Sequence, residues 1–121
     1  MNTSPKLKPL EWVTSSKADL MRLPRGVIRN FGFALYVAQI GGAHPNAKPL
    51  QGFGSAGVLE IVEDFQGNAY RAVYTVRFQE AIFVLHVFQK KSRKGIATPK
   101  PDLDLIKERL KAARQMAKEM K

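Results

Sequence analysis

The sequence has 121 residues, of which 45% are hydrophobic and 25% charged, the composition of an ordinary globular protein, so we expect one domain over residues 1–121. It has no cysteine, which excludes disulfides, thiol nucleophiles and thiolate metal sites and fits a reducing cytoplasm. Twenty Lys and Arg against ten Asp and Glu give a net charge of +10, which favours a polyanionic partner over a charge that serves solubility alone.

Membrane segments are not expected. No apolar run approaches the roughly 20 residues of a membrane span, and the first residues, MNTSPKLKPLEW, lack the apolar core of a signal peptide. We therefore expect a cytoplasmic protein with no membrane partner.

The first half of the chain is expected to form a strand and two helices. Residues 10–14 (LEWVT) are typical of a short strand, and Ser16 offers an N-cap for a short helix that ends near Pro24. From Arg25, apolar residues recur every three or four positions, which predicts an amphipathic helix that ends at two consecutive glycines. Residues 42–57 carry much of the glycine and proline and are expected to form a loop.

Three strands are expected next, over residues 58–65, 70–78 and 81–90. The second alternates cleanly, with Tyr70, Ala72 and Tyr74 on one face and Arg71 and Arg77 on the other. The third is apolar on both faces, as a central strand should be, and the short link before it predicts an antiparallel pair.

A final helix is expected after Thr98, which is a plausible N-cap, with Pro99 at its first position. Asp102 and Asp104 then suit the positive end of the helix dipole. The helix presents one apolar stripe, for core packing or for a partner, made of Leu103, Ile106, Leu110, Ala113, Ala117 and Met120.

Strand alternation predicts a cationic face on the sheet. On the strand 81–90, His86, Phe88 and Lys90 point away from the Phe83 side, which we expect the helices to cover. Arg71 of the neighbouring strand would share this open face. The basic residues Lys91, Arg93 and Lys94 would form its rim. Cations, an imidazole and an aromatic ring together suit the binding of a phosphodiester.

Each of these residues also has a plainer explanation. A core histidine with satisfied nitrogens is the preferred explanation of His86, and core packing is the more common role for a residue such as Phe88. Solvated charge at a strand end explains the basic run. Arg71 and Arg77 can pair with the hairpin carboxylates Glu60 and Glu63.

Metal and nucleotide sites have little support. His44 has no second ligand at metal spacing, and the glycine-rich residues 52–57 (GFGSAG) lack the lysine of a phosphate-binding loop. Because the expected site contains cations in place of clustered carboxylates, a nuclease built here would work without a metal or other cofactor.

Four stretches of the chain, in this order, resemble the RelE/HigB superfamily of type II toxins, in its phage-derived HigB-like branch. The most specific is YRAVYTV (70–76) followed by LHVFQKKS and then Thr-Pro within residues 85–110; the others are residues 10–24 and 46–64. The resemblance implies an α+β fold of the microbial-ribonuclease type. Its helices would pack on one face of a small antiparallel sheet, with RNA on the other.

The resemblance also implies an activity, which is cleavage of messenger RNA on the ribosome by attack of a ribose 2′-hydroxyl, leaving a 2′,3′-cyclic phosphate. Arg71 would clamp the phosphate, and Lys48 would serve proton transfer or charge stabilisation. Lys90 and Lys91 match the basic end of the family's last strand, and His86 is a candidate base. RNA contacts are expected from Phe88, Arg77, Arg93 and Lys94.

The resemblance further implies a helix-turn-helix antitoxin, encoded by the adjacent gene, as partner. In one respect the chain departs from its relatives, which often place a tyrosine or histidine near the C-terminus as proton carrier. This chain has neither after Thr98, so the general acid is left open between a lysine and a contribution from the ribosome. The alternative is a basic RNA- or ribosome-binding module without catalysis.

Overall fold

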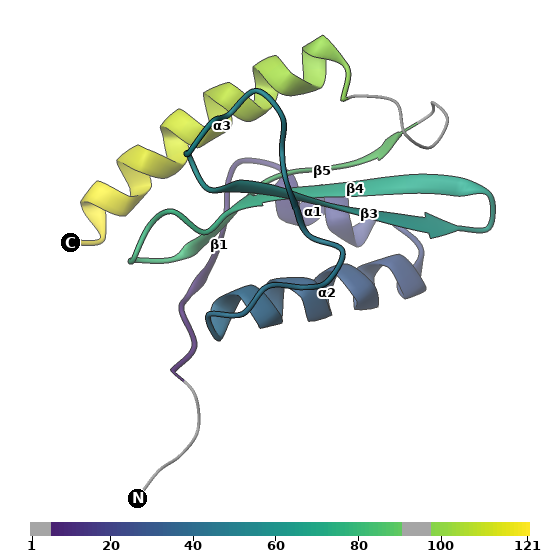
Figure 1. The fold of residues 1–121 in the computed structure, drawn as a ribbon, viewed down its shortest axis with the longest axis horizontal. Helices are drawn as coiled ribbons and strands as arrows, with labels where there is room; N and C mark the ends of the chain where they lie inside the picture. Colours follow the sequence, from purple (N-terminus) through teal and green to yellow (C-terminus); the bar gives the residue numbers. More distant parts are fainter. Residues whose placement is uncertain (1–5, 91–97) are drawn as a thin grey trace, which may run out of the picture.

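A computed structural model describes residues 6–90 and 98–121 of the protein. Its five strands form one sheet, which lies between helices (Figure 1). The strand order is β1-β5-β4-β3-β2. Among the described residues, no helix has both the length and the apolarity to cross a membrane. In chain order the elements are β1 (Leu10–Trp12), α1 (Ser16–Met21), α2 (Arg25–Gln39), β2 (Lys48–Pro49), β3 (Val58–Phe65), β4 (Asn68–Thr75), β5 (Ile82–Lys90) and α3 (Lys100–Glu119).

The strand pairing is mostly antiparallel, as expected. β5 pairs with β4, and β4 pairs with β3 through a two-residue turn at Gln66 and Gly67. Both turn residues have positive φ, +49° and +81°, as a tight hairpin turn of type I′ requires. Two pairings were not predicted: β1 runs parallel to β5, and the loop contributes the short strand β2 at the sheet edge.

The helices pack on both faces of the sheet, not on one as predicted. α1 and α2 bury Leu20, Phe31 and Leu35 against one face, which presents Ile61 and Tyr74. α3 buries a separate cluster on the opposite face, and Figure 1 shows α2 and α3 on opposite sides of the strands. The residues of this second cluster include Val73, Phe83, Leu85, Ile106, Leu110, Ala113 and Ala117.

The apolar pattern of β5 explains this arrangement. Residues 82–87 of this strand are all buried, so both of its faces need cover. α3 supplies that cover with the predicted stripe, of which Ile106 is fully buried, whereas Met120 at its end is 42% exposed. A helix on each face therefore follows from a central strand that is apolar on both sides.

A β-bulge changes which residues of β5 share a face. The register pairs Tyr74 with Val84 but Val73 with His86, so Leu85 is the extra residue. Phe83 and Leu85 consequently lie on the same side of the sheet as His86, where α3 packs. The prediction that His86 points away from the Phe83 side was wrong, because simple alternation ignores the inserted residue.

Candidate functional site

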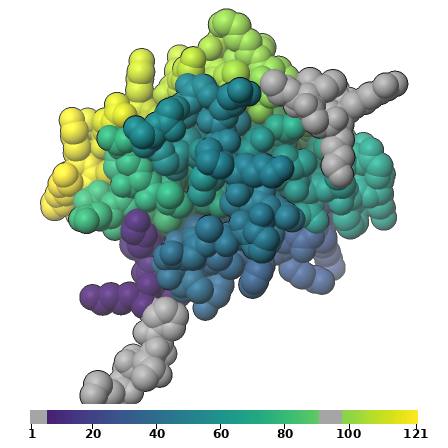
Figure 2. Space-filling view, in the orientation of Figure 1, coloured from purple at the N-terminus to yellow at the C-terminus, as the bar shows by residue number. Residues whose placement is uncertain are grey.

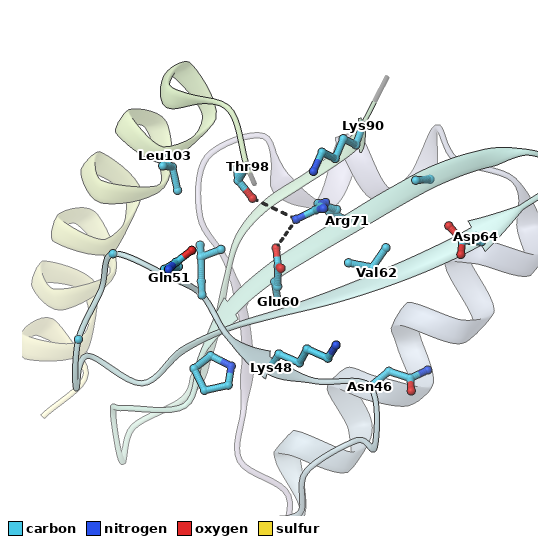
Figure 3. A pocket seen from close by; sticks show the side chains of 15 residues that line it. Asn46, Lys48, Gln51, Glu60, Val62, Asp64, Arg71, Lys90, Thr98 and Leu103 are labelled. Atoms are coloured by element: carbon cyan, nitrogen blue, oxygen red, sulfur yellow. Dashed lines mark hydrogen bonds and ion pairs between the residues drawn. The ribbon is translucent and has the colours of Figure 1, made fainter. Parts of the chain in front are cut away.

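An open cavity of about 1190 Å³ lies on the α3 side of the sheet, beside the N-terminal end of that helix (Figure 3). Strands β3, β4 and β5 provide its floor, and the loop that carries β2 provides one wall. Figure 2 shows residues 42–57 of this loop spanning from the α2 side to the α3 side. The polar residues that line the cavity include Asn46, Lys48, Gln51, Glu60, Asp64, Arg71, Lys90 and Thr98.

Arg71 lies at the centre of this floor and is only 5% exposed. Its Nη1 atom donates to Oε2 of Glu60 at 2.8 Å and to the Thr98 hydroxyl at 3.2 Å. A buried guanidinium needs such partners, because the loss of water is otherwise uncompensated. Glu60 and Thr98 therefore hold the guanidinium at the bottom of the cavity.

Thr98 does not cap α3 as predicted. The N-cap of that helix is Pro99, whose side chain makes no capping hydrogen bond, and the helix begins at Lys100. The Thr98 hydroxyl is instead turned into the site, where it accepts a hydrogen bond from Arg71. In the sequence, a threonine directly before a proline at a helix start is typical of an N-cap. The role of Thr98 in the site was therefore missed.

Lys90 is the second buried cation of the cavity and is 4% exposed. Within the described part of the chain, its Nζ atom has no hydrogen-bond partner. Burial above all, and then the nearby Arg71 charge, lower the pKa of Lys90, while the Glu60 carboxylate partly opposes them. Figure 3 shows its amino group directed toward Arg71 and Thr98.

The strand registers explain why these groups meet. Glu60 on β3 pairs with Val73, two positions from Arg71 on β4, so both side chains lie on one face. Lys90 on β5 pairs with Ala69, two positions from Arg71 in the other direction. Lys48 joins them from β2, where it pairs with Glu60, and its side chain is exposed.

His86 and Phe88 lie on the same sheet face but do not line the cavity. The His86 Nε2 atom is 2.8 Å from Oδ1 of Asp102, and its ring stacks on Phe88 with centroids 4.3 Å apart. Burial, as the largest effect, lowers the pKa of His86, although Asp102 acts in the opposite direction. The Asp102 contact was also missed, since this residue suited the helix dipole in sequence.

The other predicted RNA-binding residues lie elsewhere. Arg77 follows the end of β4 and is exposed, with Nη1 donating to the Ser55 carbonyl oxygen at 3.4 Å. Arg77 makes no ion pair with Glu63. The Glu63 carboxylate instead accepts a hydrogen bond from the Asn30 side chain at 2.6 Å. Lys91, Arg93 and Lys94 lie outside the described residues.

The arrangement has the groups for chemistry on an anion. Arg71 and Lys48 can donate to phosphate oxygens, as in other sites where cations stabilise developing charge. Glu60 can accept a proton, and Lys90, with its lowered pKa, can give one. The three predicted residues Lys48, Arg71 and Lys90 thus line one cavity. The cavity also contains Glu60, which the sequence suggested only as an ion-pair partner.

Comparison with known proteins gives the family. The family model described as phage-derived protein Gp49-like (DUF891) matches residues 18–111, most of the chain. No curated protein matches the sequence. The matched region contains all of α2, the strands β2 to β5 and Thr98 at the cavity. The chain therefore belongs to the phage-derived Gp49-like family, a family of HigB-like toxins.

Proposed function

We propose that this protein is the toxin of a type II toxin-antitoxin system of the RelE/HigB superfamily, and that it is a metal-independent endoribonuclease. It cleaves messenger RNA that occupies the ribosomal A site and so inhibits translation. The proposal rests on family membership together with the cavity.

The observation that carries this proposal is the pair of buried cations, Arg71 and Lys90, on the floor of an open cavity. Neighbouring positive charges that are removed from water raise the free energy of the empty site. A bound phosphate relieves that cost because its oxygens can accept hydrogen bonds from both Arg71 and Lys90. The net charge of +10 would also draw the protein toward RNA.

The reaction suited to these groups is transesterification within the RNA. The ribose 2′-oxygen attacks the adjacent phosphorus, and the bond from phosphorus to the 5′-oxygen breaks. This leaves a 2′,3′-cyclic phosphate and a 5′-hydroxyl. Arg71 and Lys48 stabilise the extra negative charge of the pentacoordinate intermediate.

Induction of the protein alone, followed by mapping of RNA ends, tests the proposal. We expect growth arrest and discrete 5′-hydroxyl ends in messenger RNA. Arg71→Ala should reduce cleavage about 10²–10³-fold, the usual cost of losing one donor to a transition state, and should relieve the arrest. The control is Arg29→Ala, which removes an exposed cation from α2 on the other side of the sheet. Normal growth with folded wild-type protein present would refute the proposal.

A second candidate is a basic RNA- or ribosome-binding module without catalysis. It is favoured by one observation: the Arg71 guanidinium already contacts Glu60 and Thr98, as a purely structural ion pair would. RNA binding without discrete new 5′ ends would support this module. Primer extension on RNA from induced cells separates the two candidates.

A helix-turn-helix antitoxin from the adjacent gene is the proposed partner. Co-expression of the two genes should restore growth, and the two proteins should purify as one complex. Separate elution of the two proteins and no protection from arrest would exclude this pairing.

A further inference from the structure

We propose that Glu60 and Lys90 are the general base and the general acid of the cleavage step, with Arg71 holding the phosphate between them. This inference rests on the RNA cleavage proposed above and assigns the proton transfers within it. From the sequence, Lys90 was expected to be catalytic without an assigned role, and Glu60 was expected only as an ion-pair partner.

The sheet places these three residues in a diagonal row. Strands β5, β4 and β3 are neighbours, so Arg71 lies on the strand between the other two residues. Along β4, Lys90 is level with Ala69 and Glu60 is level with Val73, two residues to either side of Arg71. Figure 3 shows Arg71 between Glu60 and Lys90.

That row matches the geometry of the reaction. The attacking and leaving oxygens lie roughly in line, on opposite sides of phosphorus. A phosphate bound to Arg71 would therefore have a carboxylate toward one of these oxygens and an ammonium group toward the other. The 2′-hydroxyl gives its proton to Glu60 as the new bond to phosphorus forms. Lys90 gives a proton to the 5′-oxygen as that oxygen leaves, so charge and protons balance.

Lys90 has the environment that a proton donor needs. It is 4% exposed, and its Nζ atom has no hydrogen-bond partner within residues 6–90 and 98–121. The lowered pKa of its ammonium group lies closer to neutral pH, which makes proton transfer to the leaving oxygen easier.

Glu60 is positioned by Arg71 itself. Their 2.8 Å contact fixes the carboxylate, whose side chain is 17% exposed, at the edge of the cavity. When phosphate oxygens accept hydrogen bonds from Arg71, they compete for the donor that holds this carboxylate, and the carboxylate is then available to the 2′-hydroxyl. Substrate binding would thus prepare the base for the reaction.

A sulfur-substituted substrate tests the role of Lys90. Ribosomes are loaded with a synthetic messenger RNA in which sulfur replaces the 5′-oxygen of the bond that the wild-type protein is found to cut. A thiolate leaves without taking up a proton, so a missing general acid matters little for this substrate. The variant is Lys90→Arg, which keeps the charge but cannot donate a proton at neutral pH.

We expect Lys90→Arg to cleave the oxygen substrate about 10²–10³-fold more slowly than wild type, and the sulfur substrate within about tenfold of wild type. Arg71→Ala should be slow on both. Equal loss of rate on both substrates, or no loss on either, would overturn the assignment of Lys90. Lys90→Gln provides a second variant if circular dichroism shows that Lys90→Arg is unfolded. If wild type cuts neither substrate, the proposed function itself fails.

The pH dependence of cleavage tests Glu60. In the wild-type protein the rate should fall toward acid pH as the carboxylate is protonated, and Glu60→Gln should be about 10²-fold slower without that fall. The matched control is Glu63→Gln, on the same strand but directed to Asn30 on the other face, which should behave as wild type. An unchanged fall in Glu60→Gln would exclude Glu60 as the base.

Discussion

Among the described residues, the α3 face of the sheet buries three basic side chains, and each has a different environment. Arg71 is held by Glu60 and Thr98, and His86 by Asp102. Lys90 has no such hydrogen bond in the described part of the chain. Because a buried charge without a partner is costly, Lys90 is the residue whose burial most needs a functional explanation. His86, outside the cavity lining and stacked on Phe88, packs as a core histidine does. Only its Nε2 atom has a partner, however, since Nδ1 makes no hydrogen bond within the described residues.

His86 should make stability depend on pH. Its pKa is lowered in the folded protein, so below about pH 6.5 the unfolded chain takes up a proton that the folded chain does not. The free energy of unfolding should therefore be highest above this pH and fall as the pH drops below it. Urea denaturation at a series of pH values measures the effect.

Two variants check the origin of this pH dependence. His86→Gln should remove the component that begins near pH 6.5. Asp102→Asn removes the group that opposes the shift, so it should make the fall steeper. A curve for His86→Gln that is parallel to that of wild type would show that another group is responsible.

At the scale of elements, α3 is attached to the sheet by few large side chains. Ile106 is fully buried among Val73, Phe83 and Leu85, whereas two of its companions on the helix are alanines. We expect Ile106→Ala to lower the free energy of unfolding by about 2–5 kcal/mol, the usual cost of a cavity in a core. Met120→Ala, at the exposed end of the same helix, should change it by less than about 0.5 kcal/mol. Similar values for both would mean that α3 is not packed as described.

The β3–β4 hairpin depends on its two-residue turn. Gly67 has φ +81°, and a Cβ atom placed on it would meet no other atom within 4 Å, so only backbone strain opposes a side chain there. Gly67→Ala should therefore destabilise the protein by about 1 kcal/mol or more. Gln66→Asn is the control, because asparagine tolerates positive φ and should be neutral or slightly stabilising. Thermal unfolding of both variants provides the comparison.

At the scale of the whole molecule, the excess of positive charge should make RNA binding sensitive to salt. If the four cations Lys90, Lys91, Arg93 and Lys94 meet phosphates, the logarithm of the affinity for single-stranded RNA should fall against log salt with a slope of about −3. Fluorescence anisotropy of a labelled oligonucleotide gives this slope. Lys48→Ala should make it shallower by about 0.7 if Lys48 also meets a phosphate, and Arg29→Ala should leave it unchanged.

Much of the fold could be predicted because its signals are local. The apolar periodicity of α2 and α3 and the alternation in β4 depend on neighbours along the chain, and these elements appear close to where they were expected. β4 begins two residues before the predicted start and ends at Thr75, three residues before the predicted end. Within the site, the resemblance pointed to Lys48, Arg71 and Lys90, which line the same cavity. The roles of Thr98 and Asp102 were not predicted, because at the start of a helix such residues usually serve the helix itself.

By itself the sequence determined the order of helices and strands, the antiparallel β4–β5 pairing, the burial of β5 on both faces and the excess of positive charge, because composition and periodicity act over a few residues. The α+β class was expected from the family resemblance. Only the tertiary structure decided that α3 covers the face opposite α2 and that a bulge at Leu85 places His86 on the Phe83 side. It also decided that Glu60, Arg71 and Lys90 meet on three adjacent strands. Those outcomes depend on strand register and on contacts between distant segments, which no local pattern encodes.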